Sequence, residues 1–125
     1  IPKHFLAVFS KDELRCIFLH EVAHVKRRHF LKDAVFALTL LSLALALSWN
    51  SVLIFLPSVF VAAVLTLSFH RRFEYEADKF AAERVSAGAM VGVLRELRRR
   101  YGEKGLVYRI SHPSIEQRIR RLGHD

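Results

Sequence analysis

Cysteine is nearly absent from this sequence, since Cys16 is the one cysteine in 125 residues. A single cysteine excludes an intrachain disulfide framework and any zinc ribbon built from several cysteines. We expect Cys16 to fill a small space in the core rather than to act as a nucleophile. Disorder is also excluded, because hydrophobic residues make up 52% of the chain and disordered chains are poor in them. The length leaves room for one domain of ordinary size.

Acidic residues are scarce as well: 12 Asp and Glu stand against 20 Lys and Arg, for a net charge of +8. Such a balance suits nucleic acid, an anionic membrane surface or an acidic partner. The sequence contains no recognisable nucleic-acid-binding motif, so we expect no nucleic-acid partner. The run Arg98-Arg99-Arg100, together with Arg95, leaves two interpretations open, a solvated helix face or contact with anionic lipid headgroups.

Charge is missing altogether from residues 34–69, although every other stretch of the chain carries it. A polar cluster at residues 48–51 divides this run into two apolar segments. At 1.5 Å per residue the segments reach roughly 21 and 27 Å, against about 30 Å of hydrocarbon. We therefore expect a transmembrane helical hairpin over residues 34–70. The alternative is a pair of buried core helices, which the remaining residues of so short a chain would hardly surround.

Basic residues flank the uncharged run on both sides and are missing from its central turn. Under the positive-inside rule, both ends of the hairpin face the cytoplasm and Trp49 reaches the opposite surface. We expect an integral protein of the cytoplasmic or inner membrane, with the lipid bilayer as a partner. The flanking residues are Lys26, Arg27, Arg28 and Lys32 before the run, and Arg71 and Arg72 after it. Because the chain begins with Ile1 rather than methionine, we also expect it to be a piece of a longer protein.

Outside this run the sequence has the period and the caps of α-helices. Ser10 and Glu13 form a capping box, and apolar residues at helical spacing extend this first helix over residues 10–33. Within the remaining part, residues 71–125, further helices are expected over residues 72–84, over residues 87–101 with Ser86 as the cap, and over residues 113–122.

The last helix and the segment before it complete the expected fold. Pro113 is expected at the first position of the last helix and Gly123 beyond its end. Residues 107–110 are expected to form a short strand or an extended loop. The fold class is therefore predicted to be all-α, with at most one short strand.

The first helix carries the motif His-Glu-x-x-His at residues 20–24. His20 and His24 are four residues apart, so both imidazoles lie on one helix face and can converge on a single ion. Glu21 is near enough to act on water at that ion without binding it. The alternative is that the two histidines belong to a solvated face. The remaining histidines outside this region, His4, His70 and His124, are expected at the surface or the membrane interface.

A catalytic zinc site of this kind needs a third protein ligand. His29 is nine residues after His20, about 180° round a straight helix, and is expected to point away. In the acidic segment after the hairpin, Glu74 and Asp78 share one helix face and Glu76 lies on the other. We expect Glu74 to be the third ligand and Asp78 to accept a hydrogen bond from a ligand histidine. The alternative is a solvated acidic turn.

The order of the motifs resembles one known family. The His-Glu-x-x-His helix is followed by the hairpin, by Glu-Tyr-Glu-Ala-Asp at residues 74–78 and by His-Pro-Ser-Ile-Glu-Gln-Arg at residues 112–118. From about Ser10 to Leu122 this arrangement is similar to the membrane-integrated gluzincin zinc metalloproteases, the family of the HtpX and type I CAAX prenyl proteases. The resemblance implies a zincin-like helix arrangement, with residues 1–125 as a fragment of a single peptidase domain.

The resemblance also implies a zinc-dependent endopeptidase and a role for each matching residue. By this resemblance His20, His24 and Glu74 bind Zn2+, Glu21 is the catalytic base, Asp78 supports the site, and His112 and Arg118 face the substrate side of the metal. In the expected reaction Glu21 takes a proton from the attacking water and returns it to the leaving amine.

The expected function is hydrolysis of protein or peptide substrates at the cytoplasmic face of the membrane, in membrane-protein quality control or in CAAX-type processing. Two alternatives of other classes stay open. A signal-sensing antirepressor metallopeptidase also joins His-Glu-x-x-His to transmembrane helices, although the two later motifs argue against it. A non-catalytic scaffold stabilised by metal is disfavoured because Glu21 is intact.

Overall fold

Five helices form the described part of the chain, which is residues 7–49, 51–102 and 112–123 of a computed structural model. They are α2 (Lys11–Lys26), α3 (His29–Leu47), α4 (Val52–Arg84), α5 (Ala87–Tyr101) and α7 (Ile115–Gly123). These residues contain no strand, so the expected all-α fold class is confirmed. The short strand or extended loop expected over residues 107–110 lies outside the described residues.

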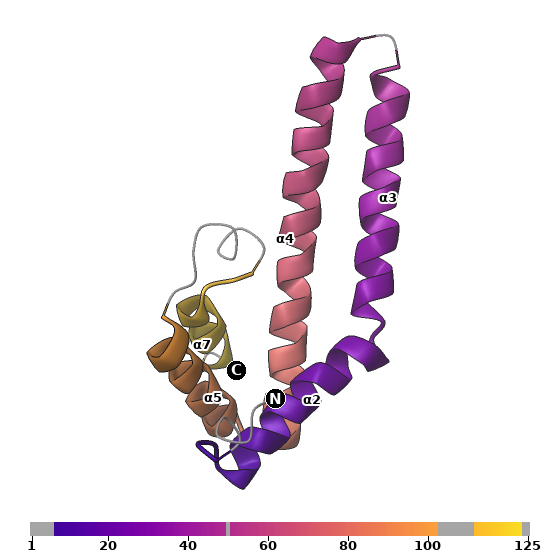
Figure 1. The fold of residues 1–125 in the computed structure, drawn as a ribbon. Coiled ribbons are helices and arrows are strands. Elements are labelled where there is room, and N and C mark those ends of the chain that lie inside the picture. Colours follow the sequence, from indigo (N-terminus) through magenta and orange to yellow (C-terminus); the bar gives the residue numbers. More distant parts are fainter. Residues whose placement is uncertain (1–6, 50, 103–111, 124–125) are drawn as a thin grey trace.

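α3 and the first half of α4 form a helical hairpin that projects from the rest of the molecule (Figure 1). α3 ends at Leu47 and α4 begins at Val52, on either side of the polar cluster where the sequence predicts the turn. Both helices are long and apolar enough to cross a membrane, and only 6% of the most apolar window of α3, and none of that of α4, is buried. Leu53 and Phe60, for example, are 87% and 69% exposed. Such apolar surfaces are stable in lipid rather than in water, which favours the membrane hairpin over buried core helices.

α4 continues without a break from the apolar hairpin into the charged segment that carries Glu74. Residues 72–84 are helical as expected, and the structure adds that they continue the second helix of the hairpin within one helix of 33 residues. The backbone hydrogen bonds of a helix form whether its side chains face lipid or water, and neither glycine nor proline separates residues 69 and 72. Glu74 is thus attached directly to the hairpin.

The chain turns a corner between α2 and α3. The first helix ends at Lys26 instead of continuing to about residue 33 as expected. Arg28 has a left-handed backbone, with φ 52° and ψ 42°, which ends one helix and starts the next in a new direction. The amide of Arg27 bonds to the carbonyl of Ala23, and that of Arg28 bonds to the carbonyl of Val25. Left-handed residues are usually glycine or asparagine, so the sequence carries no local signal for this corner.

The base of the molecule consists of α2, the C-terminal half of α4, α5 and α7. Its main core cluster contains Phe9, Cys16, Ala81, Met90, Val93, Leu94 and Leu122. A second cluster, formed by Ala23, Ala77 and Phe80, joins α2 to α4. Cys16 is fully buried, and burial raises the pKa of its thiol, so its expected role as a core residue is confirmed.

The last helix begins two residues later than expected, and it includes Gly123, which the sequence predicts just beyond its end. Ser114 and Gln117 form a reciprocal cap, in which each backbone amide donates to the side chain of the other residue over 3.1 Å. Ser114 is therefore the N-cap, and Pro113 precedes the helix instead of opening it. The cap fixes the start of α7, and this helix buries Arg118 and Leu122 against the base.

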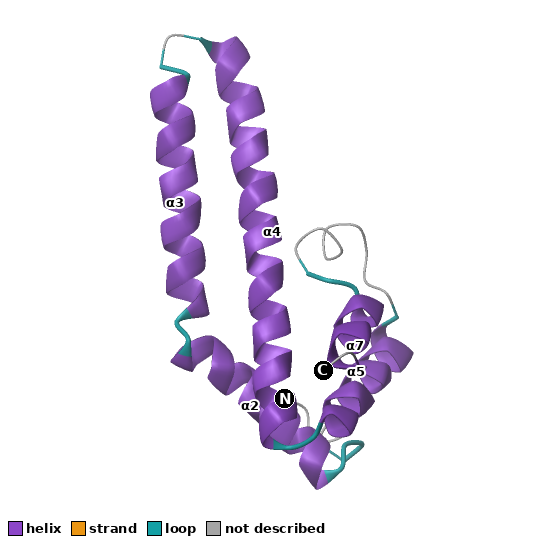
Figure 2. Ribbon diagram, turned by 180° about the vertical axis from the view of Figure 1, so that it is seen from behind, coloured by secondary structure: helices purple, strands orange, loops and turns teal. Residues whose placement is uncertain are grey.

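α2 crosses α4 where the hairpin meets the base (Figure 2). The His-Glu-x-x-His residues lie on α2, and the acidic segment lies on α4. The crossing therefore brings the two sequence motifs together at the end of the hairpin that basic residues flank.

Candidate metal centre

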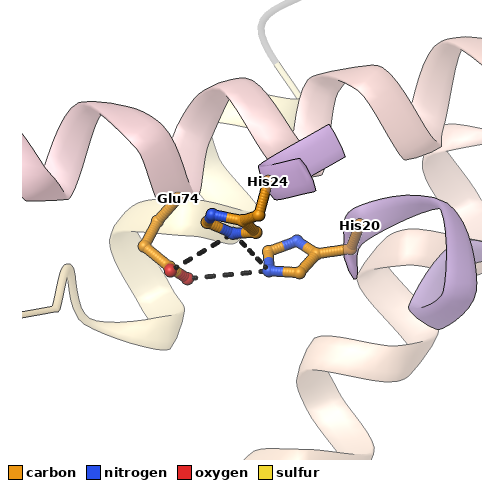
Figure 3. Close-up of side chains that lie close together, drawn as sticks. All are labelled: His20, His24 and Glu74. Carbon is orange, nitrogen blue, oxygen red and sulfur yellow. Dashed lines mark hydrogen bonds and ion pairs between the residues drawn. The ribbon is translucent and has the colours of Figure 1, made fainter. Parts of the chain in front are cut away.

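Two histidines of α2 and one glutamate of α4 face one another at the helix crossing (Figure 3). Nε2 of His20 lies 3.2 Å from Nε2 of His24 and 3.9 Å from Oε2 of Glu74. Nε2 of His24 lies 3.6 Å from Oε1 of Glu74. One donor atom of each residue thus lies within 4.8 Å of the other two. The histidines meet because residues four apart on a helix stack on one face.

These three donors fit a zinc ion by chemistry and by size. Catalytic zinc takes imidazole nitrogens and carboxylate oxygens as ligands and keeps one position open. With zinc–ligand bonds of about 2.0–2.1 Å, tetrahedral ligand atoms lie about 3.4 Å apart. The distances of 3.2, 3.6 and 3.9 Å scatter around this value. The residues present therefore suit a zinc ion between His20, His24 and Glu74.

Asp78 lies behind His20, one helical turn after Glu74. Its Oδ1 is 3.0 Å from Nδ1 of His20. A carboxylate only accepts hydrogen bonds, so Nδ1 of His20 donates and Nε2 keeps a lone pair that faces the other two donors. Burial alone would raise the pKa of Asp78, but hydrogen bonds from His20 and Arg118 outweigh burial and lower it. Asp78 is thus a charged acceptor that orients His20.

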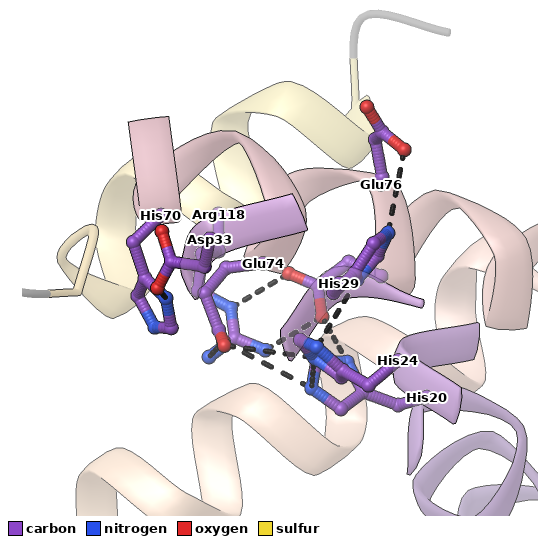
Figure 4. Close-up of polar contacts among 9 residues, drawn as sticks. His20, His24, His29, Asp33, His70, Glu74, Glu76 and Arg118 are labelled. Atoms are coloured by element: carbon purple, nitrogen blue, oxygen red, sulfur yellow. Dashed lines mark hydrogen bonds and ion pairs between the residues drawn. The ribbon is translucent and has the colours of Figure 1, made fainter. Parts of the chain in front are cut away.

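Arg118 is buried beneath the three donors (Figure 4). Its Nε and Nη2 donate to the two carboxylate oxygens of Asp78, both over 2.6 Å, and its Nη1 is 3.0 Å from Oε2 of Glu74. α7 packs on the base and turns Arg118 inward, where its guanidinium bridges the carboxylates of Asp78 and Glu74. The substrate-facing role that the family resemblance implies for Arg118 stays a prediction.

The electrostatics around His24 favour its neutral form. Burial, and next the neighbouring His20, lower the pKa of His24, while the negative charges of Glu74 and Glu21 act in the opposite direction. A histidine binds metal as neutral imidazole, so the lowered pKa suits a ligand. Glu21 itself follows His20 on α2 and has an exposed side chain.

One peptidase family matches nearly the whole chain: the model of peptidase family M48 covers residues 3–125. The chain belongs to peptidase family M48. It is also similar to the protease HtpX of Pseudomonas syringae pv. syringae (strain B728a), at 25% identity in an alignment 164 positions long that covers 98% of this chain and 56% of that protein. The chain therefore spans about half the length of this relative. No solved structure matches it.

Members of family M48 are metalloproteases, and zinc is their typical metal. The His-His-Glu set of this M48 chain is a donor set that zinc accepts. The family assignment and the geometry of the site thus agree on a metal centre at the crossing of α2 and α4.

His29 lies closer to the M48 site than the sequence predicts. His29 is not one of the three donors, but it packs behind one of them, since its Nδ1 is 3.1 Å from Nδ1 of His24, instead of pointing away from the histidine pair as expected. That expectation assumes a straight helix, whereas the left-handed Arg28 turns His29 back toward α2. No local sequence signal marks this turn, so sequence analysis alone misses the contact.

His70 also lies beside the site, at the point where the hairpin ends. Its Nδ1 is 3.0 Å from Oδ2 of Asp33 on α3, whose other carboxylate oxygen is buried and has no hydrogen-bond partner within the described residues. His70 and Glu74 are four residues apart on α4, and this helical spacing is the signal that would have placed them together.

His112 lies next to His70, with ring centroids 5.2 Å apart and ring planes at 80°. His70, Glu74 and His112 form a second group whose donor atoms lie within 4.8 Å of one another. His112 is partly exposed. The His-Pro motif therefore lies at the edge of the same site, on the side of Glu74 that faces His70.

Proposed function

We propose that this chain is the metal-binding part of a membrane-bound zinc metalloendopeptidase that cleaves protein or peptide substrates at the cytoplasmic face. The observation that carries the proposal is the convergence of His20, His24 and Glu74 within 4.8 Å, beside an exposed Glu21. Membership of family M48 supports the same class of reaction.

His20, His24 and Glu74 would hold the zinc ion, with Asp78 and Arg118 fixing two of these ligands from behind. Zinc, when bound, polarises the scissile carbonyl and lowers the pKa of the attacking water. Glu21 takes a proton from that water onto a carboxylate oxygen and passes it to the leaving amine. An exposed carboxylate next to the ligand pair suits this transfer, because it is accessible to water without ligating the metal.

The developing negative charge on the carbonyl oxygen needs a hydrogen-bond donor besides the metal. His112 is the candidate for this donor. It lies at the edge of the site near Glu74, and it is partly exposed. Arg118 is not suited to the task, because its guanidinium is already bonded to two buried carboxylates.

The exposed apolar hairpin supports anchoring in a bilayer, and the basic residues at both of its ends support a cytoplasmic site. A peptidase at this location would meet membrane proteins and membrane-attached chains. We therefore propose damaged membrane proteins or CAAX-type precursors as the substrate class.

The decisive experiment compares cleavage of casein and of an unfolded membrane protein by the full-length wild type and by Glu21→Gln. We expect Glu21→Gln to retain zinc and to lose turnover, because it removes the base and leaves every ligand in place. Glu83→Gln, an exposed change on α4, is the control and is expected to behave like the wild type.

Three results would contradict the proposal. Equal cleavage by wild type and Glu21→Gln would show that the proteolysis comes from elsewhere. Full zinc content in Glu74→Gln would show that the metal is not held by this set. Zinc binding without any cleavage by the wild type would favour the metal-stabilised scaffold.

A further inference from the structure

His29 is a buried histidine that has no role in the proposed reaction. It is 2% exposed, and its ring lies flat on Phe73, with centroids 4.4 Å apart and planes at 12°. Its Nδ1 faces Nδ1 of His24 at 3.1 Å, and its Nε2 faces Glu76 (Figure 4). Buried imidazole nitrogens are normally hydrogen-bonded, so these two neighbours decide where the proton of His29 lies.

The corner between α2 and α3 creates this contact. On a straight helix, a residue five positions after His24 would lie about 140° away from it around the axis. The left-handed Arg28 ends α2 and lets His29, the first residue of α3, turn back toward His24. The corner thus places a second imidazole behind one of the proposed zinc ligands.

The position of each proton follows from hydrogen-bond chemistry. A metal ligand at Nε2 of His24 must be neutral and must carry its proton on Nδ1. That N–H can only donate to Nδ1 of His29, which therefore holds a lone pair. The proton of His29 is then on Nε2. The opposite arrangement would protonate Nε2 of His24 and prevent it from binding metal.

Glu76 favours the first of these two arrangements. Its Oε2 lies 3.5 Å from Nε2 of His29, slightly beyond an ordinary hydrogen bond, and this nitrogen has no other partner within the described residues. A carboxylate offers only lone pairs, so a proton on Nε2 is attracted and a lone pair there is repelled. Nη1 of Arg27 donates to the same Oε2 over 2.8 Å and holds Glu76 in place.

We propose that Glu76 and His29 form a relay that holds His24 in the tautomer with a proton on Nδ1 and a lone pair on Nε2. The relay fixes the tautomer of His24, just as the hydrogen bond to Asp78 fixes the tautomer of His20. Glu76 and His29 are thus positioning residues, since neither touches the metal. This inference rests on the proposed function, because it takes His24 as a zinc ligand.

The test is the zinc affinity of the purified full-length protein, measured by competition with a chromophoric chelator. His29→Phe keeps a ring that stacks on Phe73 and removes the acceptor for His24, so we expect zinc to bind 10- to 100-fold more weakly. His29→Asn puts an amide oxygen close to the former Nδ1 position and is expected to bind zinc within a few-fold of the wild type. The unfolding midpoint of each metal-free variant is measured alongside.

Wild-type zinc affinity in His29→Phe would overturn the inference, whatever happens to the unfolding midpoint. Equal weakening in His29→Asn and His29→Phe would overturn it too, because the acceptor would then be irrelevant. Glu74→Gln is included as a reference. If Glu74→Gln binds zinc normally, the proposed metal site itself is wrong, and this outcome is distinct from a failure of the relay alone.

A second pair of variants keeps the test decisive if His29→Phe does not fold. The side chain of Glu76 is 44% exposed, so Glu76→Leu should be tolerated by the fold. It removes the carboxylate that faces Nε2 of His29 and is expected to weaken zinc binding several-fold. Glu76→Gln keeps an acceptor oxygen and is expected to have the smaller effect. Equal affinity in Glu76→Leu and the wild type would overturn the relay.

Discussion

Arg118, Asp78 and Glu74 form a buried ionic group in which one cation faces two carboxylates. Buried charges are stable only while their partners remain, since the Coulomb attraction and hydrogen bonds offset the loss of water. Two of the three groups belong to α4 and one belongs to α7. The geometry of a metal ligand therefore depends on a helix that carries no ligand itself.

Replacing Arg118 should unfold the base more easily and also disturb the site. Arg118→Leu leaves Asp78 buried without the guanidinium that donates two hydrogen bonds to it, and we expect a loss of about 3–5 kcal/mol in the free energy of unfolding. Arg120→Leu on the same helix is the control, because Arg120 is exposed and its contact to Glu116 is long, at 3.8 Å. Thermal unfolding in detergent measures both variants. A similar midpoint for the two would contradict a structural role of Arg118.

His112 calls for a kinetic test, because its proposed role concerns the transition state. His112→Ala should keep zinc and the unfolding midpoint but lower kcat about 100-fold or more, with a smaller change in KM. The measurement is steady-state cleavage of a peptide substrate together with the zinc content. An unchanged kcat would remove His112 from the reaction, and a loss of zinc would make it a ligand instead.

At the scale of the helices, the features that the sequence predicts well are local ones. The capping box at Ser10, the cap at Ser86 and the break between α3 and α4 all lie where the sequence predicts them. Each depends on side chains within a few residues of one another, so a single stretch of sequence contains the whole cause. The proposed ligand set likewise comes from spacing within two helices.

The features that the sequence does not predict depend on packing between helices. The corner at Arg28 uses a residue type that rarely has a left-handed backbone, so only tertiary contacts select it. The contacts of His29 and of Asp33 depend on that corner and on the pairing of α3 with α4. The burial of Arg118 depends on α7 packing on the base. A sequence pattern within one helix contains none of this information.

The corner itself gives a prediction at this scale. Glycine adopts a left-handed backbone freely, whereas a β-branched residue does so at a cost of about 1–2 kcal/mol or more. We expect Arg28→Gly to keep the unfolding midpoint and zinc affinity near the wild type, and Arg28→Val to lower both. The two variants are matched, because each removes the same positive charge. Equal unfolding midpoints and equal zinc affinities in the two variants would mean that the corner is not needed to hold α2 against α3.

The whole molecule combines an exposed apolar hairpin with a charged helical base, and one continuous helix joins them. α4 carries both an exposed apolar half and Glu74. With the proposed insertion of the hairpin in a bilayer, the centre would lie close to the membrane surface, at whichever face the ends of the hairpin occupy. Basic residues lie at these ends and not at the turn, and this asymmetry predicts a cytoplasmic site.

Cysteine labelling tests that orientation. Cys16 is first replaced by alanine, and then Ser51→Cys at the turn or Lys32→Cys at the base of the hairpin is introduced into the full-length protein. A membrane-impermeant maleimide should label Ser51→Cys on intact cells, whereas Lys32→Cys should react only after the membrane is opened. Both sites belong to one hairpin. Because Lys32 is exposed, a lack of labelling at Lys32→Cys on intact cells means that the membrane keeps the maleimide away from it. Labelling of Lys32→Cys but not of Ser51→Cys on intact cells would put the centre on the outer face and contradict cytoplasmic proteolysis. Labelling of both sites on intact cells would contradict a membrane-spanning hairpin.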